Sequence, residues 1–163
     1  MKPPRFRIGG IIQRRDLARI GTLGIPKRPG TAGAILTALG SKGINCAFIV
    51  QMGNAEKQDN IVFCVAQSQL EAALDILKGV SDRVGAEAMV HGSAVAMLAI
   101  FGPHFGERPG IAGTMFTALA AAGIDTLAIS TSVSTISCLV DAEQLDDAIQ
   151  VLRETFLPPR ASC

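Results

Sequence analysis

The sequence contains one segment twice. Residues 28–45 read RPGTAGAILTALGSKGIN and residues 108–125 read RPGIAGTMFTALAAAGID, with ten of the eighteen positions identical. A second pair of similar segments, residues 60–78 and 135–153, follows in the same order. Ordered matches of this kind indicate two copies of one structural unit, and 163 residues suffice for two domains of about 80 residues.

Each copy predicts the same series of elements: a short apolar strand, a loop ending in Arg-Pro-Gly, a helix, two strands and a second helix. The strands are expected at residues 18–25, 44–51 and 60–65 in the first copy, and at residues 94–101, 124–131 and 135–140 in the second. Pro29 and Pro109 suit the first positions of their helices, while Gly43 and Gly123 suit caps at the helix ends.

The second helix of each copy has a sequence pattern for its start and for its buried face. The capping-box pattern of Ser68 and Glu71, with a looser version at Asp141 and Gln144, predicts where these helices begin. Apolar residues at helical spacing predict the faces that pack on the sheet: Leu70, Ala73, Leu74 and Leu77 in the first copy, and Leu145, Ala148, Ile149 and Leu152 in the second.

The fourth strand differs between the copies. The first copy has a strand-like segment at residues 86–91, whereas the second copy ends in LPPRASC, which cannot form a central strand. The unassigned strand at residues 6–13 is therefore expected to cross over and complete the second sheet. The predicted fold is α+β: two ferredoxin-like βαββαβ units with antiparallel four-stranded sheets and helices on one face, the first unit inserted in the second. The first unit is expected at residues 17–92, and the second at residues 93–157 with the strand at 6–13.

Composition and charge exclude several function classes. The longest apolar run, residues 94–101, is too short to span a bilayer, and residues 1–13 lack a signal-peptide core, so we expect a cytoplasmic protein with no membrane partner. Eight of the fifteen Lys and Arg residues lie within residues 1–28, but Phe6 is the one aromatic residue there that could stack on a base. RNA binding on a sheet needs exposed aromatics, and Phe48 and Phe63 are expected in the core. No nucleic-acid partner is expected.

Metal and redox chemistry are not indicated either. Cys46, Cys64, Cys138 and Cys163 show no paired spacing, so we expect buried thiols in a reducing compartment. His91 and His104 are isolated in the sequence. No metal site and no cofactor are therefore expected.

The start of the first helix in each copy carries the most useful chemistry. Helix N-termini bind carboxylates and phosphates through unpaired N–H groups. Both copies also place a glycine, Gly33 or Gly113, in the first turn, where a helical glycine costs about 1 kcal/mol relative to alanine. Two interpretations remain open: a ligand approaches the helix closely, or helix and sheet pack tightly.

The repeated xPGxAxxxFxAL…GIN pattern, which ends in Ile-Ser-Thr-Ser at residues 129–132, resembles the paired ACT domains of the regulatory region of aspartokinase. The resemblance covers residues 8–156 and includes the crossing N-terminal strand. No P-loop is present, and no kinase domain fits in this length. The resemblance therefore implies a non-catalytic regulatory protein that binds an amino-acid effector between ACT units and allosterically controls an enzyme of amino-acid metabolism. The alternative is a separately produced regulatory subunit of aspartokinase that senses lysine or threonine.

The resemblance also implies the ligand-binding residues. In the family, the loop and first helical turn of one unit and the second-strand region of its partner hold the effector. The matching positions in the first unit are Pro29, Gly30, Ala32 and Gln51, together with Lys27, and those on the partner side are Ile111, Ala112, Asp125 and Thr126. No residue is expected to be catalytic. The implied partners are a second copy, in a homodimer or a higher even oligomer, and an amino-acid kinase or other biosynthetic enzyme.

Three departures from the family pattern bear on the effector. Lys27 stands where the family usually has an Asp that pairs with the effector's amino group, and Asp125 replaces an Asn. Residues 133–135 replace a charged strand. An effector ammonium near Lys27 would meet a like charge, so an acidic or neutral amino acid is expected to bind better than lysine. Acylphosphatase-like catalysis, which uses the same general fold, is not favoured because the sequence around Arg28 and Arg108 lacks that pattern.

Overall fold

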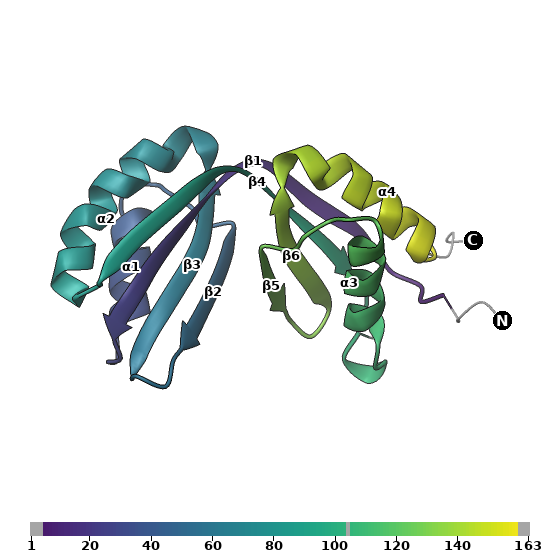
Figure 1. Ribbon diagram of the computed structural model, residues 1–163, viewed down its shortest axis with the longest axis horizontal. Helices are drawn as coiled ribbons and strands as arrows, with labels where there is room; N and C mark the ends of the chain where they lie inside the picture. Colours follow the sequence, from purple (N-terminus) through teal and green to yellow (C-terminus); the bar gives the residue numbers. More distant parts are fainter. Residues whose placement is uncertain (1–4, 104, 160–163) are drawn as a thin grey trace. The chain divides into compact units, whose positions relative to one another are not determined.

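The computed structural model describes residues 5–103 and 105–159, and the chain divides into two units. One unit consists of residues 16–95, and the other combines the residues up to 15 with those from 96 onward. Strands β1 (Gly10–Pro26) and β4 (Ala88–Phe101) each run through both units, as Figure 1 shows. The strand order is β2 (Phe48–Gly53), β3 (Gln58–Ala66), β1, β4, β6 (Thr135–Asp141) and β5 (Ala128–Thr131).

The sequence patterns predict two separate strands in place of each of these long strands. The structure makes each strand continuous but gives it an unusual residue at the unit boundary: Asp16 has φ 55° and Ala94 has φ 57°. Residues other than glycine rarely adopt this left-handed conformation. One reversed residue interrupts the pleat without ending the strand, so sequence patterns record two strands where the structure has one.

The first unit contains helices α1 (Thr31–Gly40) and α2 (Leu70–Val84) and strands β2 (Phe48–Gly53) and β3 (Gln58–Ala66). Strand β3 pairs antiparallel with both β1 and β2. The second unit repeats this arrangement with helices α3 (Ile111–Ala121) and α4 (Leu145–Thr155) and strands β5 (Ala128–Thr131) and β6 (Thr135–Asp141), which pair antiparallel. In each unit the two helices lie against one face of the strands (Figure 1). The predicted α+β class, with antiparallel strands and helices on one face, is confirmed.

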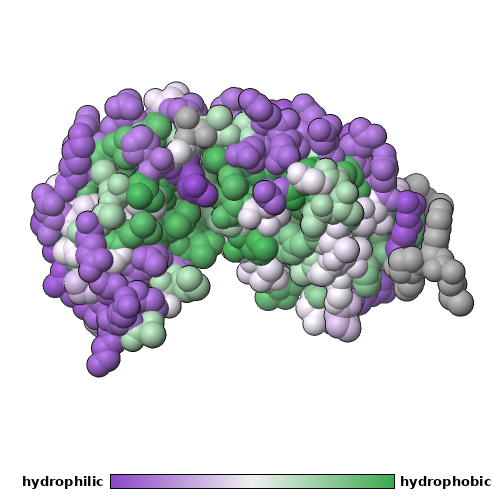
Figure 2. Space-filling model, viewed as in Figure 1, coloured by the Kyte–Doolittle hydropathy of each residue, from purple (hydrophilic) through white to green (hydrophobic). Residues whose placement is uncertain are grey.

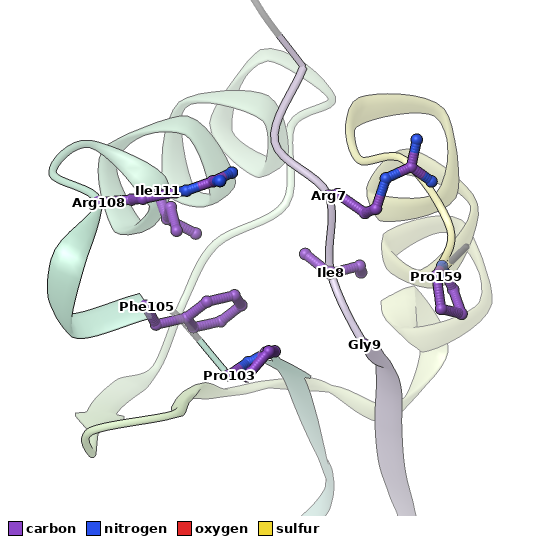
Figure 3. A pocket seen from close by; sticks show the side chains of 9 residues that line it. Arg7, Ile8, Gly9, Pro103, Phe105, Arg108, Ile111 and Pro159 are labelled. Atoms are coloured by element: carbon purple, nitrogen blue, oxygen red, sulfur yellow. The ribbon is translucent and has the colours of Figure 1, made fainter. Parts of the chain in front are cut away.

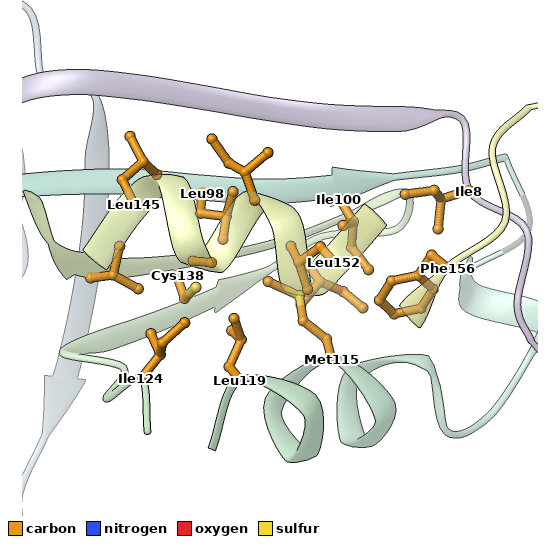
Figure 4. Close-up of a cluster of buried hydrophobic side chains, with 14 of the residues drawn as sticks. Ile8, Leu98, Ile100, Met115, Leu119, Ile124, Cys138, Leu145, Leu152 and Phe156 are labelled. Carbon is orange, nitrogen blue, oxygen red and sulfur yellow. The ribbon is translucent and has the colours of Figure 1, made fainter. Parts of the chain in front are cut away.

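Each unit has its own apolar core between helices and strands. The predicted faces of α2 and α4 are buried, which confirms the helical spacing read from the sequence. In the second unit, Met115 and Leu119 of α3 belong to the same buried cluster as Leu145 and Leu152 of α4, and Met115 lies beside Leu152 (Figure 4). Phe48 and Phe63 are buried, as predicted.

The N-terminal segment packs into the core of the second unit. Ile8 is 5% exposed and lies beside Phe156 (Figure 4). Its backbone N–H donates to the carbonyl of Leu157 at 3.0 Å, and the N–H of Gly9 donates to the carbonyl of Phe101 at 2.7 Å. Residues from both ends of the chain therefore meet in one core.

The ends of the first helices follow the prediction at one terminus and depart from it at the other. Gly43 (φ 74°) and Gly123 (φ 75°) terminate α1 and α3, and the next residue's N–H bonds back to the carbonyl five residues earlier, as predicted for glycine caps. Pro29 and Pro109, however, do not occupy the first helical positions. Left-handed Gly30 and Gly110 lie between each proline and its helix and act as N-caps without a side-chain bond.

The capping boxes predicted for the second helices are absent. Short 3-10 turns, Gln67–Gln69 and Ala142–Gln144, precede α2 and α4, and neither helix has a side-chain cap. The side chain of Gln144 instead donates to the carbonyl of Gly123 at 3.2 Å, so it joins α4 to the end of α3. A 3-10 turn therefore stands before each of these helices, in place of the side-chain cap that the sequence pattern predicts.

The three described cysteines are unpaired thiols; Cys64 and Cys138 are buried and Cys46 is half-buried. Burial raises the pKa of Cys64 and that of Cys138 to about 12. Buried, protonated thiols of this kind are unreactive. Within the part of the chain that the structure describes, no helix is both long and apolar enough to span a bilayer.

Candidate functional site

The Arg-Pro-Gly turn leads directly into the N-terminus of α1. Gly30 adopts φ 91°, a conformation that strains any residue with a side chain. Its carbonyl accepts the first helical bond, from the N–H of Ala34 at 2.9 Å. The hydroxyl of Thr31 donates to the carbonyl of Arg28 at 3.1 Å, which closes the turn. Because no side chain caps α1, its first N–H groups are available to an anion.

The first-turn glycines face open space. A Cβ atom at Gly33 or at Gly113 would have no described atom within 4 Å outside its own helix backbone, and both glycines are exposed. Tight packing of helix on sheet is therefore the wrong interpretation of these glycines. The space beside each of them is accessible from outside the unit, as the close approach of a ligand requires.

Lys27 lies beside the hairpin that joins β2 and β3. Its backbone N–H donates to the carbonyl of Lys57 at 2.9 Å, and its Nζ lies 3.8 Å from the position that a Cβ atom would occupy at Gly53. Asp59 Oδ1 lies 3.2 Å from that same position. Gln51, two residues before Gly53 in β2, is exposed. The structure therefore places Lys27 next to the end of the strand that carries Gln51.

Asp59 is a residue that the sequence analysis missed. It is 5% exposed at the start of β3, and it brings a carboxylate close to the exposed Lys27. The polar loop of residues 52–59 is the segment in which the first copy is longer than the second. An acidic residue inside that insertion was the available signal, but nothing in the sequence indicated that the hairpin turns back toward Lys27.

The predicted residues of the second unit lie at the start of α3 and in the loop before β5. Ile111 is buried and Ala112 half-buried in the first helical turn. Asp125 and Thr126 were expected in a strand, but β5 begins at Ala128. Both residues belong to the loop that follows the glycine turn ending α3, where Asp125 is exposed and Thr126 half-buried.

The arginine of the repeated motif has different surroundings in the two units. In the first unit, Arg28 Nη2 donates to the carbonyl of Arg83 near the end of α2 at 3.0 Å. The corresponding Arg108 is exposed and has no hydrogen-bond or ion-pair partner among the described residues. The same residues include no cluster of three His, Cys, Asp or Glu side chains arranged to hold a metal ion.

Both ends of the strand order expose apolar side chains. Ile49 is 42% and Met52 65% exposed on β2, and Ile129 is 44% exposed on β5. Figure 2 shows hydrophobic residues, in green, at the surface among hydrophilic ones, in purple. Edge strands with exposed apolar residues are normally covered by a partner.

Comparison with known proteins places this geometry in a family. The model of the ACT domain matches residues 98–156. Aspartate kinase of Pseudomonas fluorescens is 31% identical over 149 residues, which are 91% of this chain and 36% of that protein. The chain therefore spans about a third of the length of the curated relatives it matches.

Two solved structures match over almost their whole length. The ligand-free regulatory subunit of aspartate kinase from Thermus thermophilus has a TM-score of 0.82 at 29% identity, and the match covers 92% of this chain and 99% of that one. A chain from the crystal structure of aspartokinase alpha and beta subunits has a TM-score of 0.80 at 30% identity, and the match covers 91% of this chain and 97% of that one.

Proposed function

Because this chain belongs to the family of aspartokinase regulatory regions built from ACT domains, we propose that it binds a small amino acid and controls a kinase through that binding. Its residues form the regulatory, non-catalytic part of the family's architecture. The observation that carries the proposal is the open first turn of α1, which has no side-chain cap and has empty space beside Gly30 and Gly33.

The carboxylate of the effector docks on this first turn. The N–H groups around Gly30 and Ala32 have no side-chain cap, so a carboxylate there gains hydrogen bonds and the favourable end of the helix dipole. Pro29 holds the turn that precedes the helix, and Gln51 contacts the polar part of the effector from β2. Ile111, Ala112, Asp125 and Thr126 of a partner unit close the other side of this site.

Charge near Lys27 selects the effector. Lys27 is exposed, whereas the Asp59 carboxylate beside it is buried, so an approaching ligand meets the ammonium group first. A second positive charge at this point is disfavoured. The effector is therefore an acidic or neutral amino acid rather than lysine, and its amino group turns toward Asp125 of the partner unit.

A second copy of the chain supplies the partner unit. The edge strands β2 and β5 expose Ile49, Met52 and Ile129, and pairing of such edges extends a sheet while covering its apolar side chains. The assembly is a homodimer or a higher even oligomer. Light scattering that shows a 17.0 kDa monomer alone, with and without effector, would rule this assembly out.

The regulated enzyme is an amino-acid kinase. Support comes from the match to a chain of an aspartokinase built from alpha and beta subunits. In the related form of the proposal, this chain is a regulatory subunit distinct from the catalytic one. Capture of an amino-acid kinase by the tagged chain from lysate supports that form, and capture of a different biosynthetic enzyme identifies another target.

A thermal-shift screen against the twenty amino acids tests effector binding. A ligand that binds the native state alone stabilises it by RT ln(1 + [L]/Kd), or about 2.7 kcal/mol at a hundred times Kd. We expect one or a few neutral or acidic amino acids to raise the melting temperature. If none of the twenty does so at millimolar concentration, the effector proposal is wrong.

A further inference from the structure

The second unit contains a cavity of about 470 Å³ beside the start of α3. The N-terminal segment, the loop between β4 and α3, and the end of the described chain form its walls. Its lining residues are Arg7, Ile8, Gly9, Gly102, Pro103, Phe105, Arg108, Ile111 and Pro159. In Figure 3, Phe105, Ile8 and Arg108 extend toward a common space. Apolar side chains and two arginines, Arg7 and Arg108, line the cavity together, and none of the lining residues is acidic.

A comparison of the two repeats explains why Arg108 at this cavity has no partner among the residues that the structure describes. In the first unit, Arg28 bonds to the carbonyl of Arg83 and so joins the start of α1 to the end of α2. The position that corresponds to Arg83 in the second copy is Pro158. Its carbonyl accepts a bond from Arg7 Nη1 at 2.5 Å. Arg7 thus takes the role that Arg108 would have by analogy.

Because Arg7 already binds the carbonyl of Pro158, the side chain of Arg108 is left at the cavity wall. Arg108 is exposed and forms no hydrogen bond or ion pair with any described residue. Phe105, the counterpart of fully buried Ile25, packs on the core but is half-buried and borders the cavity. The second unit therefore has a cavity, lined by Arg108 and apolar side chains, at the place where Arg28 of the first unit bonds to the carbonyl of Arg83.

We infer that this cavity binds a small carboxylate whose body is aromatic or branched aliphatic. Arg108 holds the carboxylate, because a guanidinium offers two parallel N–H donors that match its two oxygens. Phe105, Ile8 and Pro103 contact the apolar body. A pocket of this size that combines apolar side chains with a few polar groups is typical of small-molecule sites.

This site adjoins the proposed effector site at one residue but is otherwise formed by different residues. Ile111 contributes to both, but Ala112, Asp125 and Thr126 do not line the cavity. The cavity is formed within one unit of one chain and needs no second copy. Failure of this inference would therefore leave the effector proposal intact, and the reverse is also true.

Benzoate is a suitable probe, with benzamide as its uncharged counterpart. Titration of the full chain by NMR and by calorimetry should show benzoate binding, with shifted signals from Phe105, Ile8 and Ile111. The charge-assisted bond predicts that Arg108→Gln weakens benzoate binding by about 10-fold or more but leaves benzamide binding unchanged.

Arg28→Gln is the matched control, because it alters the same motif in the other unit. This variant loses the bond to Arg83 but should bind benzoate as the unmodified chain does. A saturating amino-acid effector should not displace benzoate. The inference is overturned if no benzoate binding is detected at 10 mM ligand. It is also overturned if Arg108→Gln binds benzoate unchanged, or if the shifted signals lie around Arg28.

Discussion

The two units contain similar copies of one segment, yet the arginines of these copies make different contacts. Arg28 binds the carbonyl of Arg83, whereas Arg108 has no partner among the described residues because Arg7 binds Pro158 instead. The cause lies in the strand that completes each unit. The first unit completes its strands with β4 from within its own sequence, and the second uses the N-terminal segment, which brings Arg7 with it. A repeated motif therefore fixes local geometry, while the neighbouring strand decides which of its side chains stays free.

Removal of the N-terminal segment should produce the largest difference in stability between the two units. Deletion of residues 1–13 removes Ile8 from the second core together with the backbone bonds to Phe101 and Leu157. We expect the second unit to lose most of its stability, with loss of amide-exchange protection in α3 and α4, while α1 and α2 stay protected.

A truncated chain that keeps both its melting temperature and its exchange protection would contradict this expectation. The segment would then be an attached arm and not a structural strand.

The stability of both units should fall strongly at alkaline pH, because each unit buries one thiol. The raised pKa of Cys64 and of Cys138, about 12 against 9.0 for a free thiol, reflects desolvation by burial. The unfolded chain loses these protons above pH 9, whereas the folded chain keeps them. Stability is therefore full below pH 9 and falls as the pH rises toward 12.

Urea unfolding at pH 8, 9.5 and 11 measures this fall. The Cys64→Ala and Cys138→Ala variants should each be less stable at pH 8 but lose less stability on going to pH 11. An equal loss in the unmodified chain and in both variants would show that burial of the thiols is not the source.

Thr22 offers a smaller test within the first unit. Its hydroxyl is fully buried and has no hydrogen-bond partner among the described residues, whereas the second unit has Gly102 at this position. Thr22→Val keeps the shape and removes the unpaired polar group, so it should stabilise the chain by about 1 kcal/mol.

The matched control is Thr37→Val on the exposed surface of α1, which should change stability by less than about 0.5 kcal/mol. A loss of stability in Thr22→Val would mean that the hydroxyl has a partner after all.

The smallest expected effect concerns the residue at which β4 passes from one unit to the other. Ala94 has φ 57°, a left-handed conformation that costs an alanine about 1–2 kcal/mol. Ala94→Gly relieves this cost but loses about 0.5–1 kcal/mol to the greater freedom of the unfolded chain. Ala94→Gly should therefore slightly raise the free energy of unfolding measured by chemical denaturation, whereas Ala88→Gly in the same strand should lower it. Equal losses of stability in both variants would contradict the assignment of strain.

The sequence predicts what is local and periodic in this molecule. Helix faces such as Leu74 and Leu77, the glycine ends of α1 and α3, and the antiparallel class all follow from short patterns. What the sequence could not show depends on distant segments. The approach of Asp59 to Lys27 and the exchange of Arg7 for Arg108 arise from strands that meet after folding.

Isothermal titration calorimetry of the unmodified chain with amino acids tests the central claim most directly, because it measures effector binding and its dependence on charge together. We predict that a neutral or acidic amino acid binds more tightly than lysine, and that Lys27→Asp shifts the preference toward lysine. Lys42→Asp, the same charge change at an exposed position beyond α1, should leave the preference unchanged. Tight binding of lysine by the unmodified chain would contradict the account.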